Sequence, residues 1–536
     1  MPAEVCHIGD CQPCNCKLDP EQTSQMIKFA GRNPRENAKS IVHDGLDVCW
    51  ADSKNALLRR MQISVVPNLV QLRGRVLQAP NLQYPNSAVV VPRAGSWDAR
   101  RLNRMGKGAN WPPFAILDLS GESADSGRRK ASFEVMFSQT GKWGITSSNA
   151  LGTVSKTINE NGDIKKQAED HLRSTSEKYP QARMIIVILP DVSTQLYNGI
   201  KRKGDIDLGI HTVCLVGPQK KKFFEHDTSY MANVLTKLNL KLGGRNQALA
   251  GANQLGIISE GNTMVVGIDV THPSPGSSIS APSIAGMVAS VDSTLSQWPA
   301  ILRIQSQNRS EIVEDLRDML VSRLCLWKER NNNSLPANIL VYRDGVSEGQ
   351  YNIVINDELP RLQQAVKTMY DGLPNPKISI IIVGKRHNTR FYPTSEEHAD
   401  NSSNSLAGTI VDRGITQSHN WDFFLQSHTA LQGTAKPAHY FVVHDEIFRS
   451  KYRAANSPSA ADALEDLTHK MCYLFGRATK AVSVCPPAYY ADLVCDRARC
   501  YLSEVFEGTK KEQVSQAELT AAIKIHRNLA NSMFYI

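Results

Sequence analysis

Short apolar runs of strand length alternate with helix-like segments through most of this 536-residue chain. The clearest runs are ARMIIVILP (182–190), IHTVCLVG (210–217), TMVVGIDV (263–270), NILVYRDG (338–345) and ISIIIVG (378–384). A continuous apolar run of this length indicates a buried strand, and the segments between the runs show helical spacing. Because alternating strands and helices are typical of a parallel sheet covered by helices, the chain is predicted to adopt an α/β fold.

The residue pattern changes twice along the chain, which predicts three regions. Residues 1–85 contain a helical stretch and then an extended connector with repeated Pro and Asn. Residues 86–249 and 250–536 both show the α/β alternation. Within the last region, a long helix is predicted over 310–330, beginning after a possible cap at Ser310, from an apolar stripe made of Ile312, Leu316, Met319, Leu320, Leu324 and Trp327.

Composition is that of a globular protein and permits a polyanionic partner without requiring one. The apolar fraction is 41% and the formal net charge is +9, with basic segments at 200–205 and 219–222. The sequence has no run of about 18 apolar residues. The N-terminus lacks the basic start and apolar block of a signal peptide. A cytoplasmic or nuclear location is expected, with cytoplasm preferred and no membrane partner.

Eleven cysteines are present, most of them scattered singly, which fits reduced thiols. The exception is a cluster near the N-terminus that contains Cys6, Cys11, Cys14 and Cys16. A zinc site is one interpretation, although no second CxxC or pair of histidines follows at finger spacing. A loose terminal segment is the other interpretation.

Acidic residues occur at or near the ends of two of the predicted strands. Asp269 interrupts the run 263–270, and Asp344 follows the apolar part of NILVYRDG. Glu311 lies at the predicted start of the helix between them, and Asp492 lies in the first turns of a helix predicted for PPAYYADLVCDRARCYL. Two strands of one sheet can bring such carboxylates to the same edge. An Asp-Gly pair at a strand end also caps turns, so the pattern alone leaves both interpretations open.

Four converging carboxylates would carry a specific chemistry. Carboxylates a few Å apart cannot all stay ionised unaided. Mg²⁺ prefers oxygen ligands, and two ions about 3.5–4 Å apart can stabilise the attacking and leaving oxygens of a phosphodiester. The acidic set therefore predicts phosphodiester hydrolysis, if the four side chains meet.

The motifs around these acids resemble the PIWI domain of eukaryotic Argonautes. In chain order they are GIDVTHP, QNRSEIVEDL, YRDGVSEGQ, GKRHNTRFYP, QGTAKPAHY and PPAYYADLV, and together they span 260–536. Upstream, ILPDVSTQLYNGIKRKGD and LTKLNLKLGG are similar to the Argonaute MID domain. CKLDPEQTSQMI and RGRVLQAPN are similar to the linker that precedes MID. The resemblance is strongest to fungal quelling-type Argonautes.

The resemblance implies a Rossmann-like MID domain (86–249) packed on an RNase H-like PIWI domain (250–536), after a linker segment (1–85). Neither an N-terminal domain nor a PAZ domain is recognised, so a MID–PIWI fragment is expected. The family's activity implies that the chain binds a small guide RNA and cleaves a complementary target RNA. Cleavage by the fragment alone is expected to be weak, because the lobe with the N-terminal and PAZ domains would form part of the channel that holds the guide–target duplex.

The family's catalytic positions fall on Asp269, Glu311, Asp344 and Asp492. The resemblance implies that Asp269, Asp344 and Asp492 ligate two Mg²⁺ or Mn²⁺ ions when RNA is bound, and that Glu311 is a finger that inserts to complete the site. Many animal relatives that cleave RNA carry histidine where this chain has Asp492. Because aspartate also ligates Mg²⁺, metal competence is expected to survive.

Two helices are expected to aim basic groups at one point. Tyr197 and Lys201 are four residues apart on one predicted helix, and Lys237 and Lys241 are four apart on another. Solvated helix faces would also explain these pairs. The resemblance instead assigns them to the pocket for the guide's 5′ phosphate and first base, a pocket to which it adds Thr212, Arg497 and the terminal Ile536.

One position of that pocket departs from the family. Val213 stands where many relatives have glutamine, and it cannot donate a hydrogen bond. Thr212 is expected to take over that contact. The resemblance further assigns guide-backbone contacts, which position a nucleic acid without reading its sequence, to Lys385, Arg386, His428, Arg477, Ser483 and Tyr489.

Two other functions remain open at this point. A guide-binding module that recruits silencing proteins without cutting would keep the same acids. Another RNase H-like enzyme, such as a transposase or integrase, would transfer DNA strands and would give no reason for the set Tyr197, Lys201, Lys237 and Lys241.

Overall fold

The structure is a computed structural model that describes residues 18, 20–48, 55–84, 89–98, 108–121, 126–142, 150–216, 227–306, 309–452, 458–509 and 513–536. The cysteine cluster at Cys6–Cys16 and the basic segment 219–222 lie outside these residues. The chain divides into two compact units. Unit 1 comprises 1–71, 390–405 and 430–435, and unit 2 comprises 72–389, 406–429 and 436–536.

Unit 1 contains the helical stretch that the sequence predicts near the N-terminus. Its helices are α1 (Pro20–Ala30), α2 (Pro34–Ser40), α3 (Leu46–Val48) and α4 (Ala56–Arg60), with a π-helical segment over Ile41–Gly45. Asn33 caps α2 with a capping box, which explains why the predicted single stretch breaks between Ala30 and Pro34. Asn37 donates a hydrogen bond to the Tyr392 hydroxyl at 2.8 Å, which ties α2 to the segment 390–405 of the same unit.

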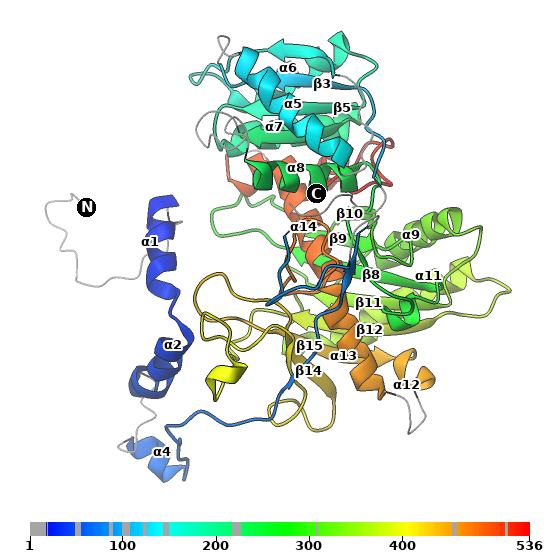
Figure 1. Ribbon diagram of the computed structural model, residues 1–536. Coiled ribbons are helices and arrows are strands. Elements are labelled where there is room, and N and C mark those ends of the chain that lie inside the picture. The colour runs from blue at the N-terminus through cyan, green and yellow to red at the C-terminus, as the bar shows by residue number, and fades with distance from the viewer. Residues whose placement is uncertain are drawn as a thin grey trace, which may run out of the picture. The chain divides into compact units, whose positions relative to one another are not determined.

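The smaller sheet of unit 2 is parallel and lies between two helical layers (Figure 1). Its order is β4-β3-β5-β6, from β3 (Phe114–Asp118), β4 (Ala150–Ser155), β5 (Met184–Leu189) and β6 (His211–Val216). One face packs on α5 (Ser126–Lys142) and α8 (Thr228–Lys241). The other packs on α6 (Ile164–Lys178) and α7 (Thr194–Arg202). The predicted alternation of strands and helices is confirmed here.

Local signals set the ends of these helices. Asp163, Ser193 and Asp227 each accept backbone hydrogen bonds as N-caps, of α6, α7 and α8 respectively. A π-helical segment, Lys203–Leu208, continues α7 and ends at Gly209, whose φ of +62° favours glycine. Two short strands, β2 (Leu82–Gln83) and β7 (Ala248–Leu249), pair antiparallel and join the two ends of this region.

The larger sheet of unit 2 has nine strands in the order β1-β13-β14-β15-β12-β11-β8-β9-β10. The central strands are β8 (Thr263–Thr271), β11 (Asn338–Asp344) and β12 (Lys377–Gly384), which run parallel. Antiparallel strands flank them: β9 (Ile284–Ala289), β10 (Ala300–Ile304), β13 (Thr409–Val411), β14 (Trp421–Gln426), β15 (Ala438–Asp445) and β1 (Arg75–Val76).

Helices cover both faces of the larger sheet. α9 (Leu316–Arg330) and α11 (Leu359–Met369) pack on one face. α13 (Ala460–Met471) and α14 (Pro486–Tyr501) pack on the other. The remaining short helices are α10 (Tyr351–Ile353), α12 (Phe448–Lys451), α15 (Ser503–Phe506) and α16 (Gln516–Ala522). None of the described helices is both long and apolar enough to span a bilayer.

The long helix predicted for 310–330 begins later than expected. α9 starts at Leu316, so Ser310 is not its cap, and both Glu311 and Ile312 precede the helix. The stripe from Leu316 to Trp327 is buried as predicted. The physical reason for the late start is that backbone groups of residues 311 and 313 are bound by side chains of the neighbouring helix and strand rather than by a helical turn.

Candidate functional site

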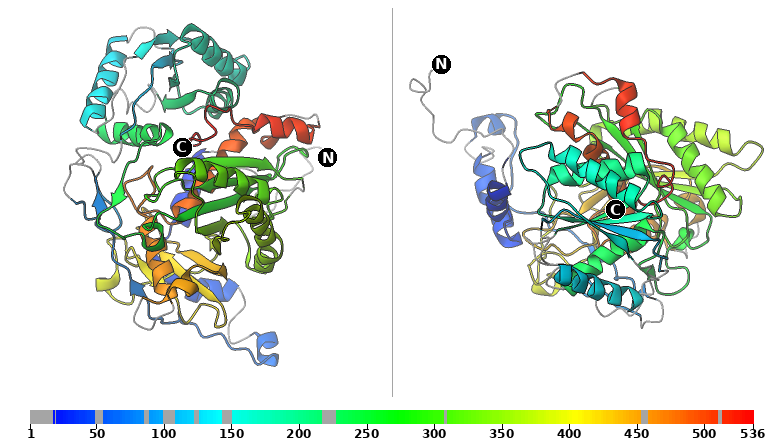
Figure 2. Two further views of the ribbon diagram at one scale, coloured as in Figure 1. Left: turned by 90° about the vertical axis from the view of Figure 1, so that its right-hand side faces the viewer. Right: turned by 90° about the horizontal axis from the view of Figure 1, so that it is seen from above.

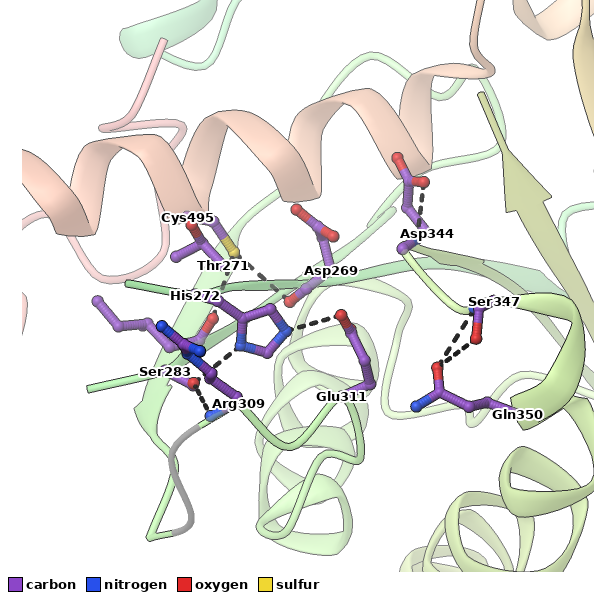
Figure 3. A network of polar contacts seen from close by, with 12 residues as sticks. Asp269, Thr271, His272, Ser283, Arg309, Glu311, Asp344, Ser347, Gln350 and Cys495 are labelled. Carbon is purple, nitrogen blue, oxygen red and sulfur yellow. Dashed lines mark hydrogen bonds and ion pairs between the residues drawn. The ribbon is translucent and has the colours of Figure 1, made fainter. Parts of the chain in front are cut away.

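The carboxyl ends of the parallel strands bring two of the predicted acids to one edge of the larger sheet. Asp269 is near the end of β8 and Asp344 is the last residue of β11. Arg343 is paired with Ile268, so Asp344 is level with Asp269 on the neighbouring strand. Alternation along each strand directs both carboxylates to the face that α14 covers, and Figure 3 shows both pointing toward that helix.

Asp492 reaches the same edge from α14. Loss of hydration, then the charge of Asp269, raises the pKa of Asp492 to about 6. Burial, followed by the charges of Asp269 and Asp492, raises the pKa of Asp344 to about 7. The pKa of Asp269 is raised by burial, against the opposing effect of Arg343. Burial is the largest cause of each shift, and repulsion between neighbouring carboxylates adds to it, so these three predicted residues lie near one another.

Glu311 approaches Asp269 from the loop before α9, on the other side of the edge. Gly345 separates them: a Cβ at that position would lie 3.2 Å from Asp269 Oδ1 and 3.6 Å from Glu311 Oε2. Gly345 also has a φ of +86°, which side chains rarely adopt. Only glycine therefore leaves this small space between the two carboxylates open.

His272 and Arg343 hold the Glu311 loop, and sequence reasoning assigned neither a role. His272 Nε2 donates to Glu311 Oε1 at 2.7 Å, and His272 Nδ1 lies 2.8 Å from Ser283 Oγ (Figure 3). Arg343, fully buried, donates to the main-chain oxygens of Glu311 and Asp344. Its Nε also binds both carboxylate oxygens of Glu358, at 3.1 and 3.2 Å. The signal that the sequence offered was the position of His272 inside GIDVTHP and of Arg343 inside YRDGVSEGQ, the motifs that carry the two aspartates.

The carboxylate oxygens at this edge of the sheet fit a hard cation, as the predicted metal site requires. Glu311 Oε2 is buried and has no hydrogen-bond partner in the part of the chain that the structure describes. Oxygen atoms of this kind are the ligands that Mg²⁺ prefers. Among the described residues, no three His, Cys, Asp or Glu side chains are already close enough together to hold a metal ion. Mutual repulsion of uncompensated carboxylates is a physical reason for that spacing.

A second polar centre lies between the smaller sheet, α14 and the C-terminal tail. Lys201 is almost fully buried and donates to the Thr212 carbonyl at 2.8 Å and to Thr212 Oγ1 at 2.9 Å. Lys241 is also buried and donates to the Phe534 carbonyl. The tail ends at Ile536, itself buried, and Figures 1 and 2 show this end of the chain beside α8. These lysines are therefore not the solvated helix faces that the pattern alone allowed.

Arg497 connects this centre to α14. It donates to the Tyr197 hydroxyl at 3.0 Å, to the Phe534 carbonyl at 3.0 Å and to the Tyr535 carbonyl at 3.2 Å. Its guanidinium also binds Asp205 Oδ2 at 2.8 Å, and Tyr501 donates to the same oxygen at 2.8 Å. Asp205 is fully buried and was not singled out from the sequence, where it follows the basic segment IKRKG.

Several basic side chains lie close together in this centre. Burial, then Arg477, Lys201 and Arg497, lowers the pKa of Lys237 to about 8. The pKa of Lys241 is held well below its usual value by burial and by the same neighbours Lys201 and Arg497. His211, at the start of β6, has a pKa lowered to about 3 by burial and by Lys241. Such a cluster of cations favours a multiply charged anion. The structure thus brings together the predicted residues Tyr197, Lys201, Thr212, Lys237, Lys241, Arg497 and Ile536.

The six residues predicted to contact the guide backbone lie in three different parts of unit 2. Lys385 donates to Ser483 Oγ at 2.5 Å and lowers the pKa of His428, which burial brings to about 4. Arg386 lies near enough to Asp269 and Asp492 to lower the pKa of both. Arg477 lies close to Tyr197 and Tyr489, beside the centre that contains Lys201 and Arg497, and Tyr489 stacks on Phe475 with ring centroids 4.5 Å apart.

Family models match most of the chain. A Piwi domain model matches residues 184–503, and an Argonaute linker 2 domain model matches residues 36–84. The linker match lies inside the predicted region 1–85. The Piwi match begins within the smaller sheet, ahead of residue 250, so the boundary between MID and PIWI stays a prediction.

Relatives and solved structures agree with these matches. The chain is 32% identical to Protein argonaute MEL1 of Oryza sativa subsp. japonica, covering 100% of this chain and 52% of that protein. It is 30% identical to Protein argonaute of Schizosaccharomyces pombe, covering 100% of this chain and 62% of that protein. The chain therefore spans about half the length of the plant relatives it matches. Because plant and fungal proteins are about equally similar, the fungal quelling-type assignment stays a prediction.

Among solved structures, Kluyveromyces polysporus Argonaute with a guide RNA matches with a TM-score of 0.79 and 26% identity, over 97% of this chain and 62% of that one. The N. crassa QDE-2 AGO MID-PIWI domains match with a TM-score of 0.59 and 32% identity, over 81% of this chain and all of that one. The predicted α/β architecture and the resemblance are thereby confirmed: the chain belongs to the Argonaute family.

Proposed function

We propose that this protein acts in small-RNA-guided RNA silencing, holding the 5′-phosphate end of a guide RNA and cleaving complementary target RNA by hydrolysis. The observation that carries the cleavage proposal is the convergence of Asp269, Asp344 and Asp492 on one sheet edge, with raised pKa values. The positive centre around Lys201, Lys237 and Arg497 carries the guide-binding proposal. Family membership supports both.

In this mechanism Asp269, Asp344 and Asp492 would hold two divalent cations, Mg²⁺ or Mn²⁺. When bound, these ions stabilise charge on the attacking and leaving oxygens and lower the pKa of water. Glu311, held by His272, orients the water through its free carboxylate oxygen. Arg386 offers positive charge beside the carboxylates, where a phosphodiester of the target would lie. Cleavage leaves a 3′ hydroxyl and a 5′ phosphate.

Guide binding follows from the positive centre and from stacking. Lys237, Lys241 and Lys201 suit a terminal phosphate that carries nearly two negative charges. The Tyr197 ring, which contacts the cations Lys201 and Arg497 at centroid distances of 5.3 and 5.8 Å, can also stack on the first base. Base pairing between guide and target would then select the target, while Lys385, Ser483 and His428 contact the guide backbone.

A comparison of guides tests this function. RNA guides that differ only in a 5′ phosphate or a 5′ hydroxyl are incubated with the protein, and a labelled matched RNA is then added with Mg²⁺. The expected result is tighter binding of the phosphorylated guide and cleavage of the target at a single bond. Equal affinity for the two guides would contradict the proposal. Phosphate-dependent binding without cleavage would instead support a non-cutting module that recruits silencing proteins.

The lowered pKa of Lys237 predicts that guide affinity falls as pH rises above 8. The free protein loses the Lys237 proton near pH 8, whereas a bound phosphate favours the charged amine and raises its pKa. Binding therefore takes up a proton above pH 8, and affinity falls by up to about tenfold per pH unit. Kd measured at pH 7, 8 and 9 should show this slope. Lys237→Met should bind more weakly at pH 7 with a flatter profile, and an unchanged slope would contradict the assignment.

His272→Ala is expected to slow target cleavage by about 10²-fold without changing guide affinity. The substitution removes the only ring that donates to Glu311 Oε1 among the described residues, so the Glu311 side chain loses its orientation. Misplacement of a reacting group by about 1 Å can cost this much. Single-turnover cleavage rates with saturating guide measure the effect. Ser283→Ala, which loosens His272 indirectly, should show a smaller loss, and a wild-type rate in His272→Ala would rule out this role.

A further inference from the structure

α14 lies unusually close to the larger sheet at two glycines. A Cβ at Gly267 would lie 1.9 Å from the main-chain oxygen of Pro487, at the start of α14. A Cβ at Gly286 would lie 2.9 Å from Cys495 Sγ, 3.2 Å from Val494 Cγ1 and 3.3 Å from the Ala491 oxygen. At both positions the helix occupies the space that a side chain would otherwise fill.

Gly286 is in a special position because it is the cross-strand partner of Asp269. In the antiparallel pair of β8 and β9, Asp269 is directly opposite Gly286. Directly opposed residues present their side chains on the same face of a sheet, and here that face is the one covered by α14. A side chain at position 286 would therefore lie beside the Asp269 carboxylate, under the turn of α14 that contains Asp492.

Cys495 is the helix residue that fills this space. It is almost fully buried, and its thiol donates to the Asp269 carbonyl at 3.5 Å and to the Ile284 carbonyl at 3.7 Å. Figure 3 shows Cys495 pointing from α14 toward the strand that carries Asp269. A side chain of this size fits against glycine, and any larger pair would overpack the contact.

We propose that Gly286 and Cys495 form a size-matched pair that sets the depth of α14 on the sheet, and thereby the separation of the Asp269 and Asp492 carboxylates. Both are positioning residues, since neither is among the proposed metal ligands. The inference rests on the proposed function in that cation binding requires a fixed spacing of those carboxylates. A functional constellation tolerates displacements of only about 0.5 Å, so a small shift of the helix is expected to matter.

Three variants test the pair: Gly286→Ala, Cys495→Ala and the double variant. Gly286→Ala is expected to push α14 outward, so that its crystal structure shows a longer Asp269–Asp492 separation than wild type. Its single-turnover cleavage should be about tenfold slower, with a higher half-saturating Mg²⁺ concentration and unchanged guide affinity. Cys495→Ala should have a smaller effect. In the double variant the clash with sulfur is gone, and both separation and cleavage should return to within about threefold of wild type.

A second variant keeps the test decisive if Gly286→Ala does not fold. Cys495→Val adds bulk from the helix side of the same contact, and it should also lengthen the Asp269–Asp492 separation. An unchanged separation in either enlarged variant, or a slow Gly286→Ala that Cys495→Ala does not rescue, would overturn the inference. Absence of cleavage by the wild-type protein would contradict the proposed function instead, and the crystallographic separations would still decide the role of this pair.

Discussion

Asp269→Asn is expected to abolish target cleavage, with a loss of at least about 10³-fold and no change in guide affinity beyond about twofold. A loss of this size is about 4 kcal/mol of transition-state stabilisation. Asparagine keeps the size of the side chain but removes the charge that would bind the divalent cations. Asp269 interacts with both of the other aspartates at this edge, since its charge raises the pKa of Asp344 and of Asp492.

Asp269→Asn is not expected to destabilise the fold, so its loss of cleavage would not be caused by unfolding. Burial raises the pKa of Asp269 in the folded protein above its unfolded value. The folded state therefore holds more protons, and this residue makes stability fall as pH rises above the unfolded pKa. Removing the charge at pH 7.5 should leave Tm equal to or above that of wild type.

Single-turnover cleavage and thermal denaturation measure the two effects. Asp318→Asn is the matched control, because Asp318 lies on α9 with its side chain 64% exposed. It should behave as wild type in both assays. Cleavage by Asp269→Asn within tenfold of the wild-type rate would contradict a catalytic role for this edge of the sheet.

Arg497→Met is expected to destabilise unit 2 by about 3–5 kcal/mol and to abolish the preference for a 5′-phosphorylated guide. Removing one member of a buried ion pair leaves its partner as an uncompensated buried charge. Asp205 is fully buried, and its Oδ2 accepts hydrogen bonds from both Arg497 and Tyr501. The substitution also removes the Arg497 hydrogen bonds to the Phe534 and Tyr535 carbonyls of the C-terminal tail, although Lys241 still donates to the Phe534 carbonyl.

A second substitution separates the two consequences of losing Arg497. In Asp205→Asn/Arg497→Met the uncompensated charge is gone, so urea denaturation should recover most of the lost stability. Guide affinity should stay low, because the cation is still missing. Arg317→Met, with a half-exposed side chain, is the control and should change stability by less than about 0.5 kcal/mol. Equal stability of the single and double variants would contradict the buried ion pair.

Residue patterns predicted the sheet edges well because strand periodicity is local. The apolar runs that contain Asp269 and precede Asp344 form adjacent parallel strands, and their register places the two residues level with each other. The i, i+4 spacing likewise predicted that Lys237 and Lys241 share a helix face. Their proximity to Lys201 depended on the family resemblance, because spacing along a chain says nothing of which helices meet.

Long-range contacts account for what the sequence pattern missed. Glu311 was predicted at a helix start, but Arg343 binds its carbonyl from β11 and Glu358 accepts a hydrogen bond from the Val313 amide. Those contacts hold the segment as a loop beside Asp269. Asp205 is another such case: it follows a run of basic residues and would pass for a surface charge, whereas its partners Arg497 and Tyr501 are almost 300 residues away. No local signal encodes such pairs.

The most direct measurement is anomalous diffraction from crystals of the protein with a 5′-phosphorylated guide, an uncleavable matched target and Mn²⁺. We predict Mn²⁺ peaks within ligand distance of Asp269, with Asp344 and Asp492 completing the coordination and the scissile phosphate adjacent. Mn²⁺ bound elsewhere, or a guide–target duplex seated at this edge with no metal peak between the carboxylates, would contradict the account.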